Sequence, residues 1–291
     1  MKIRIIKAGI VFVVLALVLG PVNILAEGEK PPAPGAGTTL APGEGTTVAT
    51  ADQDGEDRPT LYADVAFLSQ YIWRGYELSK DSLVIQPSVT AAYKGFSLNL
   101  WGNFDTDVYT GPNKGDSKWN ETDFTFGYDT SFGPVGIGAG YIYYAVDAWE
   151  DTQEFYLSVG GDVILAPTLS VYWDVDEYPG WYFNLGISHS FELPHEISLD
   201  LAGSVGYYIS ENDSIVDYDH NLNATTSRYN NFQDGLVSVG LTIPFWKYFA
   251  AVPMIAYSFP LGNAADNMLK ATSLSNDASH FFGGVTFSMV F

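Results

Sequence analysis

The stretch that decides the fold is FFGGVTFSMVF, residues 281–291. Its odd-numbered positions carry large apolar side chains, with Gly283 among them: Phe281, Val285, Phe287, Met289 and Phe291. The even positions are mixed and include Thr286 and Ser288. Alternation with a period of two residues indicates a β-strand, because successive side chains leave opposite faces of an extended backbone. The stretch therefore predicts a strand with one apolar face.

This apolar face continues to the carboxyl terminus at Phe291. The closing strand of a membrane barrel turns such a face toward lipid, whereas a soluble domain would leave it in water. The pattern resembles the C-terminal insertion signal of bacterial outer-membrane barrels, which the barrel-assembly machinery reads. We therefore expect an all-β fold, a transmembrane antiparallel up-and-down β-barrel in contact with outer-membrane lipid and lipopolysaccharide.

The amino terminus predicts export. Lys2, Arg4 and Lys7 precede the apolar run 8–20, and Ala26 offers a cleavage point before Glu27. The run is too short to cross a bilayer and is typical of a secretory signal peptide, residues 1–26. Residues 27–58 are rich in Pro, Gly and Thr, which predicts a disordered periplasmic leader, either a passive spacer or a partner-binding tail. We assign residues 59–291 to the barrel.

Composition excludes several classes of function. The formal net charge of −21 argues against nucleic acid and anionic surfaces as partners. The chain has no cysteine, which excludes disulfides and thiol nucleophiles. Beyond the signal peptide, no apolar run is long enough for a helical span, and the four histidines are scattered, which argues against a transition-metal site. We expect no cofactor; a Ca²⁺ site built from loop aspartates stays open.

From Leu61 onward, alternating segments recur and are separated in turn by short and long connections. We count about twelve strands of roughly ten residues, an even number as single-chain bacterial barrels have. At ~3.3 Å per residue and a tilt of ~40°, such strands span ~25 Å, the height of the apolar band. Tight Gly and Pro turns are expected in the periplasm. The long polar loops 75–81, 106–118, 210–231 and 260–279 are expected outside the cell.

The first hairpin resembles a known family. SQYIWRG (residues 69–75), Gln86-Pro87, Gly95-Phe96 and WGNFD (residues 101–105) are similar to the Y-x-[FW]-R-G start and the G-F…W-x-x-x-D continuation of the TorF-type porin family. Glu121-x-Asp123 and Glu154-x-Tyr156 extend the resemblance into the middle of the chain. The resemblance implies an outer-membrane barrel labelled a porin, without a defined solute.

The inward parity of the strands is acidic. In phase with it are Asp64, Asp105, Asp123, Asp129, Glu154, Asp162, Asp174, Asp176 and Asp200. Carboxylates in a narrow wet channel attract cations and repel anions. The sequence thus predicts a channel for passive diffusion of small hydrophilic solutes, neutral or cationic. The alternatives are that acids at strand ends are merely hydrated, and that the barrel is a non-conducting structural or adhesive protein that presents its loops.

Two further residues share the inward parity. Arg74, at the end of the first strand, is expected to pair with Asp105 or Asp123 and to brace the lumen, with a solute contact as the alternative. Trp101 is expected to fill the lumen, with a sugar contact as the alternative. Glycines at 136, 138 and 140 should leave room inside.

Aromatic residues on the outward parity predict the interfacial girdles of a membrane barrel. These residues are Tyr71, Trp73, Tyr141, Tyr143, Trp173, Trp181, Phe245, Trp246 and Phe249.

Two enzyme hypotheses are weak. A barrel phospholipase needs a serine and a histidine that face each other. In Ser188-His189-Ser190 these residues are adjacent on a strand, so their side chains point to opposite faces. Asp217, Asp219 and His220 in a long loop could activate water as barrel proteases do, but acidic loops with a stray histidine are common. We expect no enzyme activity.

Overall fold

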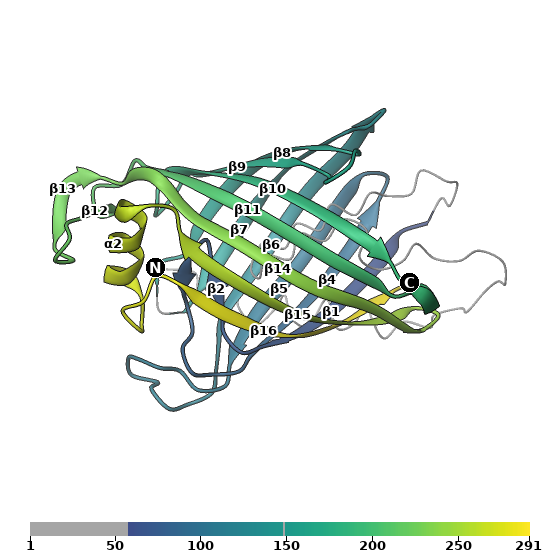
Figure 1. Cartoon of the computed structure of the whole chain (residues 1–291), viewed down its shortest axis with the longest axis horizontal. Coiled ribbons are helices and arrows are strands. Elements are labelled where there is room, and N and C mark those ends of the chain that lie inside the picture. Colours follow the sequence, from purple (N-terminus) through teal and green to yellow (C-terminus); the bar gives the residue numbers. More distant parts are fainter. Residues whose placement is uncertain (1–57, 148) are drawn as a thin grey trace, which may run out of the picture. The chain divides into compact units, whose positions relative to one another are not determined.

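The computed structural model describes residues 58–147 and 149–291, so the predicted signal peptide and leader lie outside the described residues. Twelve antiparallel strands form one closed barrel, as predicted. They are β1 (Thr60–Leu68), β4 (Val84–Tyr93), β5 (Phe96–Asp105), β6 (Lys118–Phe132), β7 (Val135–Val146), β8 (Thr152–Gly161), β9 (Thr168–Asp174), β10 (Gly180–Glu192), β11 (Ser198–Ser210), β14 (Asn230–Trp246), β15 (Phe249–Pro260) and β16 (His280–Val290). Figure 1 shows them wound around one axis.

The first and last strands close the cylinder. Leu68 of β1 pairs with Gly284 of β16, and the register continues to Tyr62 opposite Val290. The backbone N–H of Phe291 donates to the carbonyl of Leu61 at 2.9 Å. Each of the twelve strands therefore has a hydrogen-bonded neighbour on both sides, which is the condition for a sheet in an apolar solvent.

Alternation along the strands separates two faces. In β8, Thr152, Glu154, Tyr156 and Ser158 are buried, while residues such as Leu157 between them are exposed. The buried parity therefore faces the lumen and the exposed apolar parity faces outward. A register shift marks a bulge in β14, because two residue steps from Val205 to Tyr207 of β11 match three steps from Gly235 to Phe232 of β14.

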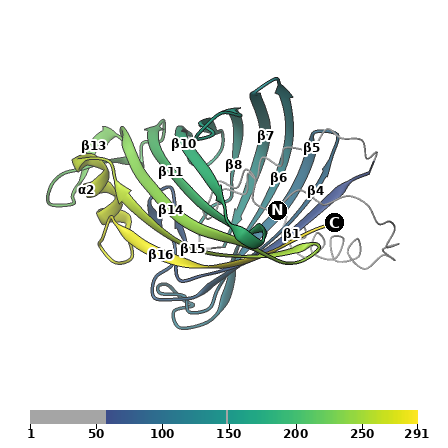
Figure 2. The same cartoon turned by 45° about the vertical axis from the view of Figure 1, so that its right-hand side comes forward.

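The two ends of the barrel differ. Turns as short as Lys94-Gly95 and Gly133-Pro134 lie at the end that holds the carboxyl terminus. The longest connections, residues 69–83, 106–117, 211–229 and 261–279, lie at the other end. Figure 2 shows α2 (Asn263–Thr272) and β13 (Ala224–Arg228) gathered at this long-loop end.

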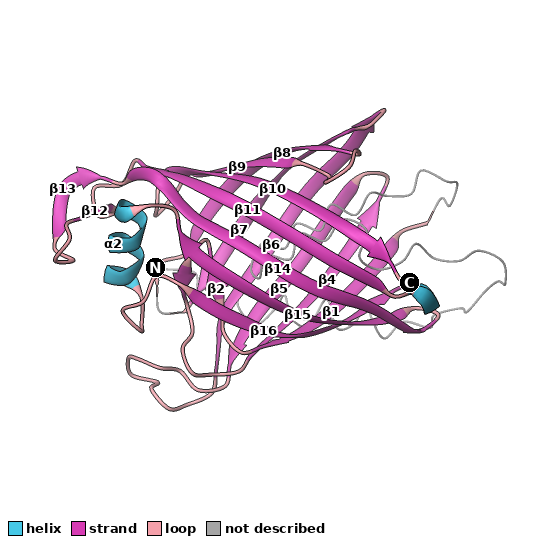
Figure 3. Cartoon of the chain, viewed as in Figure 1, coloured by secondary structure: helices cyan, strands magenta, loops and turns pink. Residues whose placement is uncertain are grey.

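The long loops contain structure that we did not predict, as the colours of Figure 3 show. The loop after β1 holds a hairpin, β2 (Ile72–Trp73) and β3 (Tyr76–Glu77). A second hairpin, β12 (Val216–Tyr218) and β13 (Ala224–Arg228), lies in the predicted loop 210–231. The helix α2 (Asn263–Thr272) lies in the predicted loop 260–279, and a short 3-10 turn, η2 (Pro194–Glu196), joins β10 to β11. Within the described residues, no helix is both long and apolar enough to cross a membrane.

Candidate functional site

The loop after β1 folds back into the lumen. Its hairpin, residues 72–77, pairs Ile72 with Glu77 and Trp73 with Tyr76. The two residues at the tip, Arg74 and Gly75, have φ of 49° and 83°, as a two-residue type I′ turn requires. We call residues 70–79 the inner loop.

The tip of the inner loop is tightly fitted against β14 and α2. A Cβ at Gly75 would lie 3.0 Å from Cβ of Asp234 on β14 and 3.0 Å from Cδ1 of Leu269 on α2. Gln233 Nε2 donates to the carbonyl of Arg74 at 3.3 Å. Both the positive φ and the close approach favour glycine at this position.

The Arg74 guanidinium forms a buried ion pair with Glu154 of β8. Its Nη1 and Nη2 donate to Oε1 and Oε2 at 2.7 and 2.8 Å, and the two side chains are 7% and 5% exposed. The guanidinium carbon lies 4.4 Å, 4.6 Å and 4.4 Å from the ring centres of Trp73, Tyr172 and Tyr182. A bidentate carboxylate and aromatic faces together are strong partners for a planar cation.

Neighbouring strands of the wall supply the other parts of this site. Tyr144 of β7 donates its hydroxyl to Glu154 Oε2 at 2.8 Å. Tyr156, Tyr172, Tyr182 and Tyr208 stand opposite one another on β8, β9, β10 and β11. We call these four residues the tyrosine row. It forms an aromatic wall on which the hairpin tip lies.

The base of the inner loop packs on β5 and β6. The Tyr71 ring lies 5.7 Å from the ring of Trp101, and both side chains are buried. The backbone N–H of Tyr71 donates to Ser79 Oγ at 2.8 Å, and its hydroxyl is hydrogen-bonded to Glu121. Trp101 thus fills the lumen beneath the inner loop. The predicted outward position of Tyr71 and Trp73 is wrong, because β1 ends at Leu68 and the chain turns inward after it.

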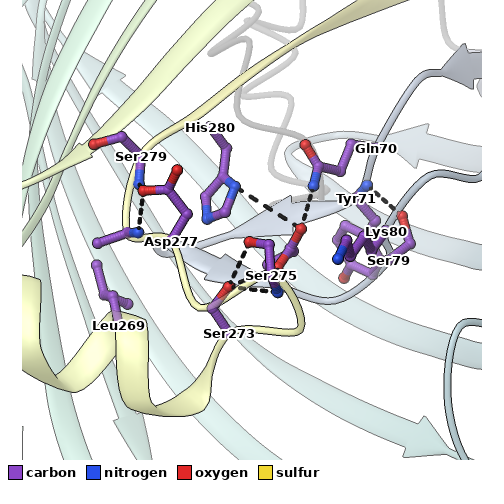
Figure 4. A network of polar contacts seen from close by, with 12 residues as sticks. Gln70, Tyr71, Ser79, Lys80, Leu269, Ser273, Ser275, Asp277, Ser279 and His280 are labelled. Carbon is purple, nitrogen blue, oxygen red and sulfur yellow. Dashed lines mark hydrogen bonds and ion pairs between the residues drawn. The ribbon is translucent and has the colours of Figure 1, made fainter. Parts of the chain in front are cut away.

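A buried carboxylate, Glu77, fastens the inner loop to the loop that carries α2. Its Oε1 accepts from Gln70 Nε2 at 2.7 Å, and its Oε2 accepts from Ser273 Oγ at 2.6 Å and from the N–H of Ser275 at 2.7 Å. His280 Nδ1 lies 4.0 Å from Oε1 of Glu77. Figure 4 shows Gln70, Ser273, Ser275 and His280 around this point. We call this set of contacts the Glu77 latch.

Above the latch, α2 covers the opening. Its buried residues Met268 and Leu269 pack with Tyr229 and Ala278, and Tyr76 of the hairpin packs against this cluster. The free space beside the hairpin tip is a cavity of about 20 Å³, lined by residues that include Arg74, Tyr182 and Asp234. That space is close to the volume needed for a single water. The inner loop therefore crosses the lumen at this level, with contacts to Glu154 on one side and Gln233 on another.

The acids that we predicted to face inward divide into groups. Asp105, Asp123, Glu154 and Asp174 are buried in the lumen, and Asp64 and Asp129 are half-buried. Asp174 Oδ2 accepts from Thr152 Oγ1 at 2.7 Å, whereas Asp123 Oδ1 is buried with no hydrogen-bond partner among the described residues.

Of the three other predicted acids, Asp200 also lies on the inward face, whereas Asp162 and Asp176 do not. Asp200 accepts from Ser190 Oγ at 2.6 Å and from Thr242 Oγ1 at 2.7 Å, near the short-turn end. Asp162 and Asp176 are exposed and lie beyond the ends of β8 and β9, so their predicted lumen positions are wrong. For these two residues the alternative of hydrated acids at strand ends holds.

Two other expectations need correction. Arg74 was expected to pair with Asp105 or Asp123, but its bidentate partner is Glu154, which the hairpin reaches by crossing the lumen. Gly140 does not leave open space, because a Cβ there would lie 2.5 Å from Cε1 of Tyr156, whose ring leans over this position. Asp129 and Ser158 occupy the space over Gly138, whereas nothing lies within 4 Å of a Cβ at Gly136.

The sequence analysis missed Trp73, Glu77, Glu121, Tyr144 and the tyrosine row as parts of the site. The tyrosines had a signal, since they share the inward parity of Glu154 and Asp174. Glu77 had none, because its partners Ser273 and Ser275 are nearly two hundred positions away, with separations of 196 and 198.

The residues of the two enzyme hypotheses make ordinary structural contacts. The His189 ring packs edge-on against Phe191, with ring centres 4.6 Å apart. Asp219 Oδ1 accepts from the N–H groups of Asn221 and Asn223, and the Asn223 bond holds the pKa of Asp219 below its usual value. Asp217 Oδ1 accepts from Asn231 Nδ2 at 2.8 Å. In the described part of the chain, no group of three or more His, Asp and Glu residues is arranged to hold a metal ion.

Comparison with known proteins adds a fold relationship. The chain matches no model of a known protein family and no curated protein. The NanC porin superposes with a TM-score of 0.50 at 10% identity, over 79% of this chain and 98% of that one. An outer membrane channel from Pseudomonas putida F1 gives 0.43 at 10% identity, over 80% and 94% of the two chains. The likeness to the NanC porin shows a shared barrel fold, and the resemblance to the TorF-type family stays a prediction.

Proposed function

We propose that this chain is an outer-membrane channel for small hydrophilic solutes that the inner loop holds closed in the state described here. The observation that carries the proposal is a closed barrel with an apolar outside and a polar inside. Both a lipid environment and an aqueous path require this partition.

The outer surface supports a place in a membrane. Large apolar side chains are exposed on the outward parity of successive strands, among them Leu98, Phe126, Leu157, Leu185, Val239 and Ile255. A soluble protein seldom exposes so continuous an apolar surface. The Trp173 and Trp181 rings stack 5.1 Å apart, and Phe245, Trp246 and Phe249 gather at the short-turn end. These two sets suit the two membrane interfaces.

The inner surface supports passage of neutral or cationic solutes. Between the inner loop and the short turns, the lumen-facing positions carry groups such as Ser158, Asn184, Ser238 and Asp129, which offer hydroxyl, amide and carboxylate contacts. Carboxylates focus a negative potential in a narrow channel. We propose that the long-loop end faces the outside of the cell and that the chain is not an enzyme.

Planar-bilayer recording of the purified protein tests the proposal. We expect discrete conductance steps. In a KCl gradient, the reversal potential should have the sign of a cation-selective channel. Anion selectivity would overturn the solute preference. A protein that stays silent both intact and with the inner loop replaced by a short linker would overturn the channel.

The second candidate is a non-conducting barrel that presents its long-loop end to other molecules. The blocked lumen beside Arg74 favours it, as does the packing of α2 over the opening. Replacement of the inner loop by a short linker distinguishes the two: a gated channel then conducts, whereas a structural barrel stays silent.

A further inference from the structure

We propose that the pocket around the Arg74 side chain is a binding site for a guanidinium-bearing solute, and that Arg74 is its tethered occupant. This inference rests on the proposed channel function only insofar as a solute must reach the pocket through the lumen. It names the class of solute that the channel recognises.

The chemistry of the pocket matches a planar cation. Glu154 presents both carboxylate oxygens to the two terminal nitrogens of the guanidinium, at 2.7 and 2.8 Å. The Tyr172 and Tyr182 rings lie 4.6 and 4.4 Å from its central carbon. A compact ammonium cannot make the two parallel hydrogen bonds and stacks less well on aromatic rings, so this geometry selects a guanidinium.

The wall of the barrel supplies most of the pocket. Glu154, Tyr172 and Tyr182 lie on the adjacent strands β8, β9 and β10, and Tyr144 on β7 orients the carboxylate through its hydroxyl. Of the groups around the guanidinium described above, only Trp73 comes from the inner loop. Withdrawal of the Arg74 side chain would therefore leave a carboxylate and two aromatic rings in place.

The surroundings add further acidic groups. Asp123 lies close enough to Glu121 and Glu154 for electrostatic interaction, and within the described part of the chain its Oδ1 is buried without a hydrogen-bond partner. A carboxyl oxygen buried in this way favours a cation or a hydrogen-bond donor nearby. The pocket therefore lies in a part of the lumen suited to cationic solutes.

Chemical rescue of the full-length protein tests the site. Arg74→Ala removes the tethered occupant and should lower the unfolding midpoint of the barrel in lipid vesicles. Methylguanidinium restores the missing group, and we expect it to raise the midpoint of the variant with saturation at millimolar concentration, the effective concentration typical of a short tether. At equal ionic strength, we expect that about a tenfold higher concentration of methylammonium is required for the same rise in the unfolding midpoint.

Two variants serve as controls. Arg228→Ala removes an exposed arginine that pairs with Asp213 in a long loop, and methylguanidinium should not change its midpoint beyond the effect of salt. In the double variant Arg74→Ala with Glu154→Gln, the rescue should disappear. Equal effects of the two cations, or a rescue that survives Glu154→Gln, would overturn the proposal.

If Arg74→Ala does not fold, its folding yield replaces the midpoint as the readout. Methylguanidinium in the refolding mixture should then raise the yield and methylammonium should not; equal yields would reject the site. Neither readout needs ion flow. A failed rescue therefore rejects the solute site alone, whereas a bilayer that stays silent with the loop-replaced variant as well rejects the channel.

Discussion

Gly140 and Gly136 lie on the same face of β7 but have different surroundings. A Cβ at Gly140 would meet the carbonyl of Phe126 and the ring of Tyr156, whereas nothing lies within 4 Å of one at Gly136. Tyr156 can lean across β7 because both Gly140 and its partner Gly127 lack a side chain. The orientation of the tyrosine row thus depends on glycines of the neighbouring strands.

Gly140→Ala should therefore destabilise the barrel, by about 1–3 kcal/mol as is usual for overpacking. Gly136→Ala is the matched control, and it should leave stability unchanged or raise it slightly. Urea unfolding in vesicles, followed by tryptophan fluorescence, measures both. Similar midpoints for the two variants would contradict the packing described for Tyr156.

At the same scale, the sequence predicted the chemistry of Arg74 better than its partner. A buried arginine needs a carboxylate, and parity limited the choice to inward acids. We considered Asp105 and Asp123 because we placed Arg74 at the end of the first strand. The hairpin moves its side chain across the lumen to Glu154, 80 positions along the chain.

At the scale of elements, alternation predicted the barrel strands well, because each has one face in water and the other exposed as apolar surface. It failed for the inner loop, since Tyr71 and Trp73 continue the apolar parity of β1. The signal for an inward hairpin was Arg74-Gly75 between two aromatic residues, a pair that suits a tight turn. For α2, the signal was Ala265, Met268 and Leu269 at helical spacing.

The Glu77 latch gives a prediction for two elements together. Glu77→Gln keeps the shape of the side chain but weakens charge-assisted hydrogen bonds to Ser273 and Ser275, a local loss of about 1–3 kcal/mol. Amide hydrogen exchange should then rise in residues 273–279 and in the hairpin. Glu192→Gln, at an exposed position at the end of β10, is the control. Unchanged exchange in both segments would mean that the latch does not hold them.

Removal of the inner loop gives a second prediction at this scale. Leu68 and Val84 are paired neighbours, so a short Gly-Ser linker is long enough to join β1 to β4. Single-channel conductance should rise severalfold, because the blocking element is absent. Shortening the loop 106–117 leaves the hairpin in place and should not produce this rise. If both changes have the same effect, the hairpin is not the barrier.

At the scale of the whole molecule, two exposed apolar residues separate lipid contact from water contact. Leu157 is 50% exposed in the middle of β8, and Ile164 is 80% exposed in the turn that follows. Leu157→Arg should cost about 2–4 kcal/mol in a bilayer, because the charge would lie in the hydrocarbon. Ile164→Arg should cost almost nothing. Unfolding in vesicles compares the two; equal costs would place Leu157 outside the hydrocarbon.

The junction of β1 with β16 has a consequence for assembly. The segment that blocks the lumen follows the first strand immediately, whereas the seam is sealed only when the final strand arrives. The inner loop is thus synthesised before the other eleven strands of the barrel that surrounds it. A barrel that closed with the inner loop outside would lack the contacts of Arg74 with Glu154 and of Glu77 with Ser273.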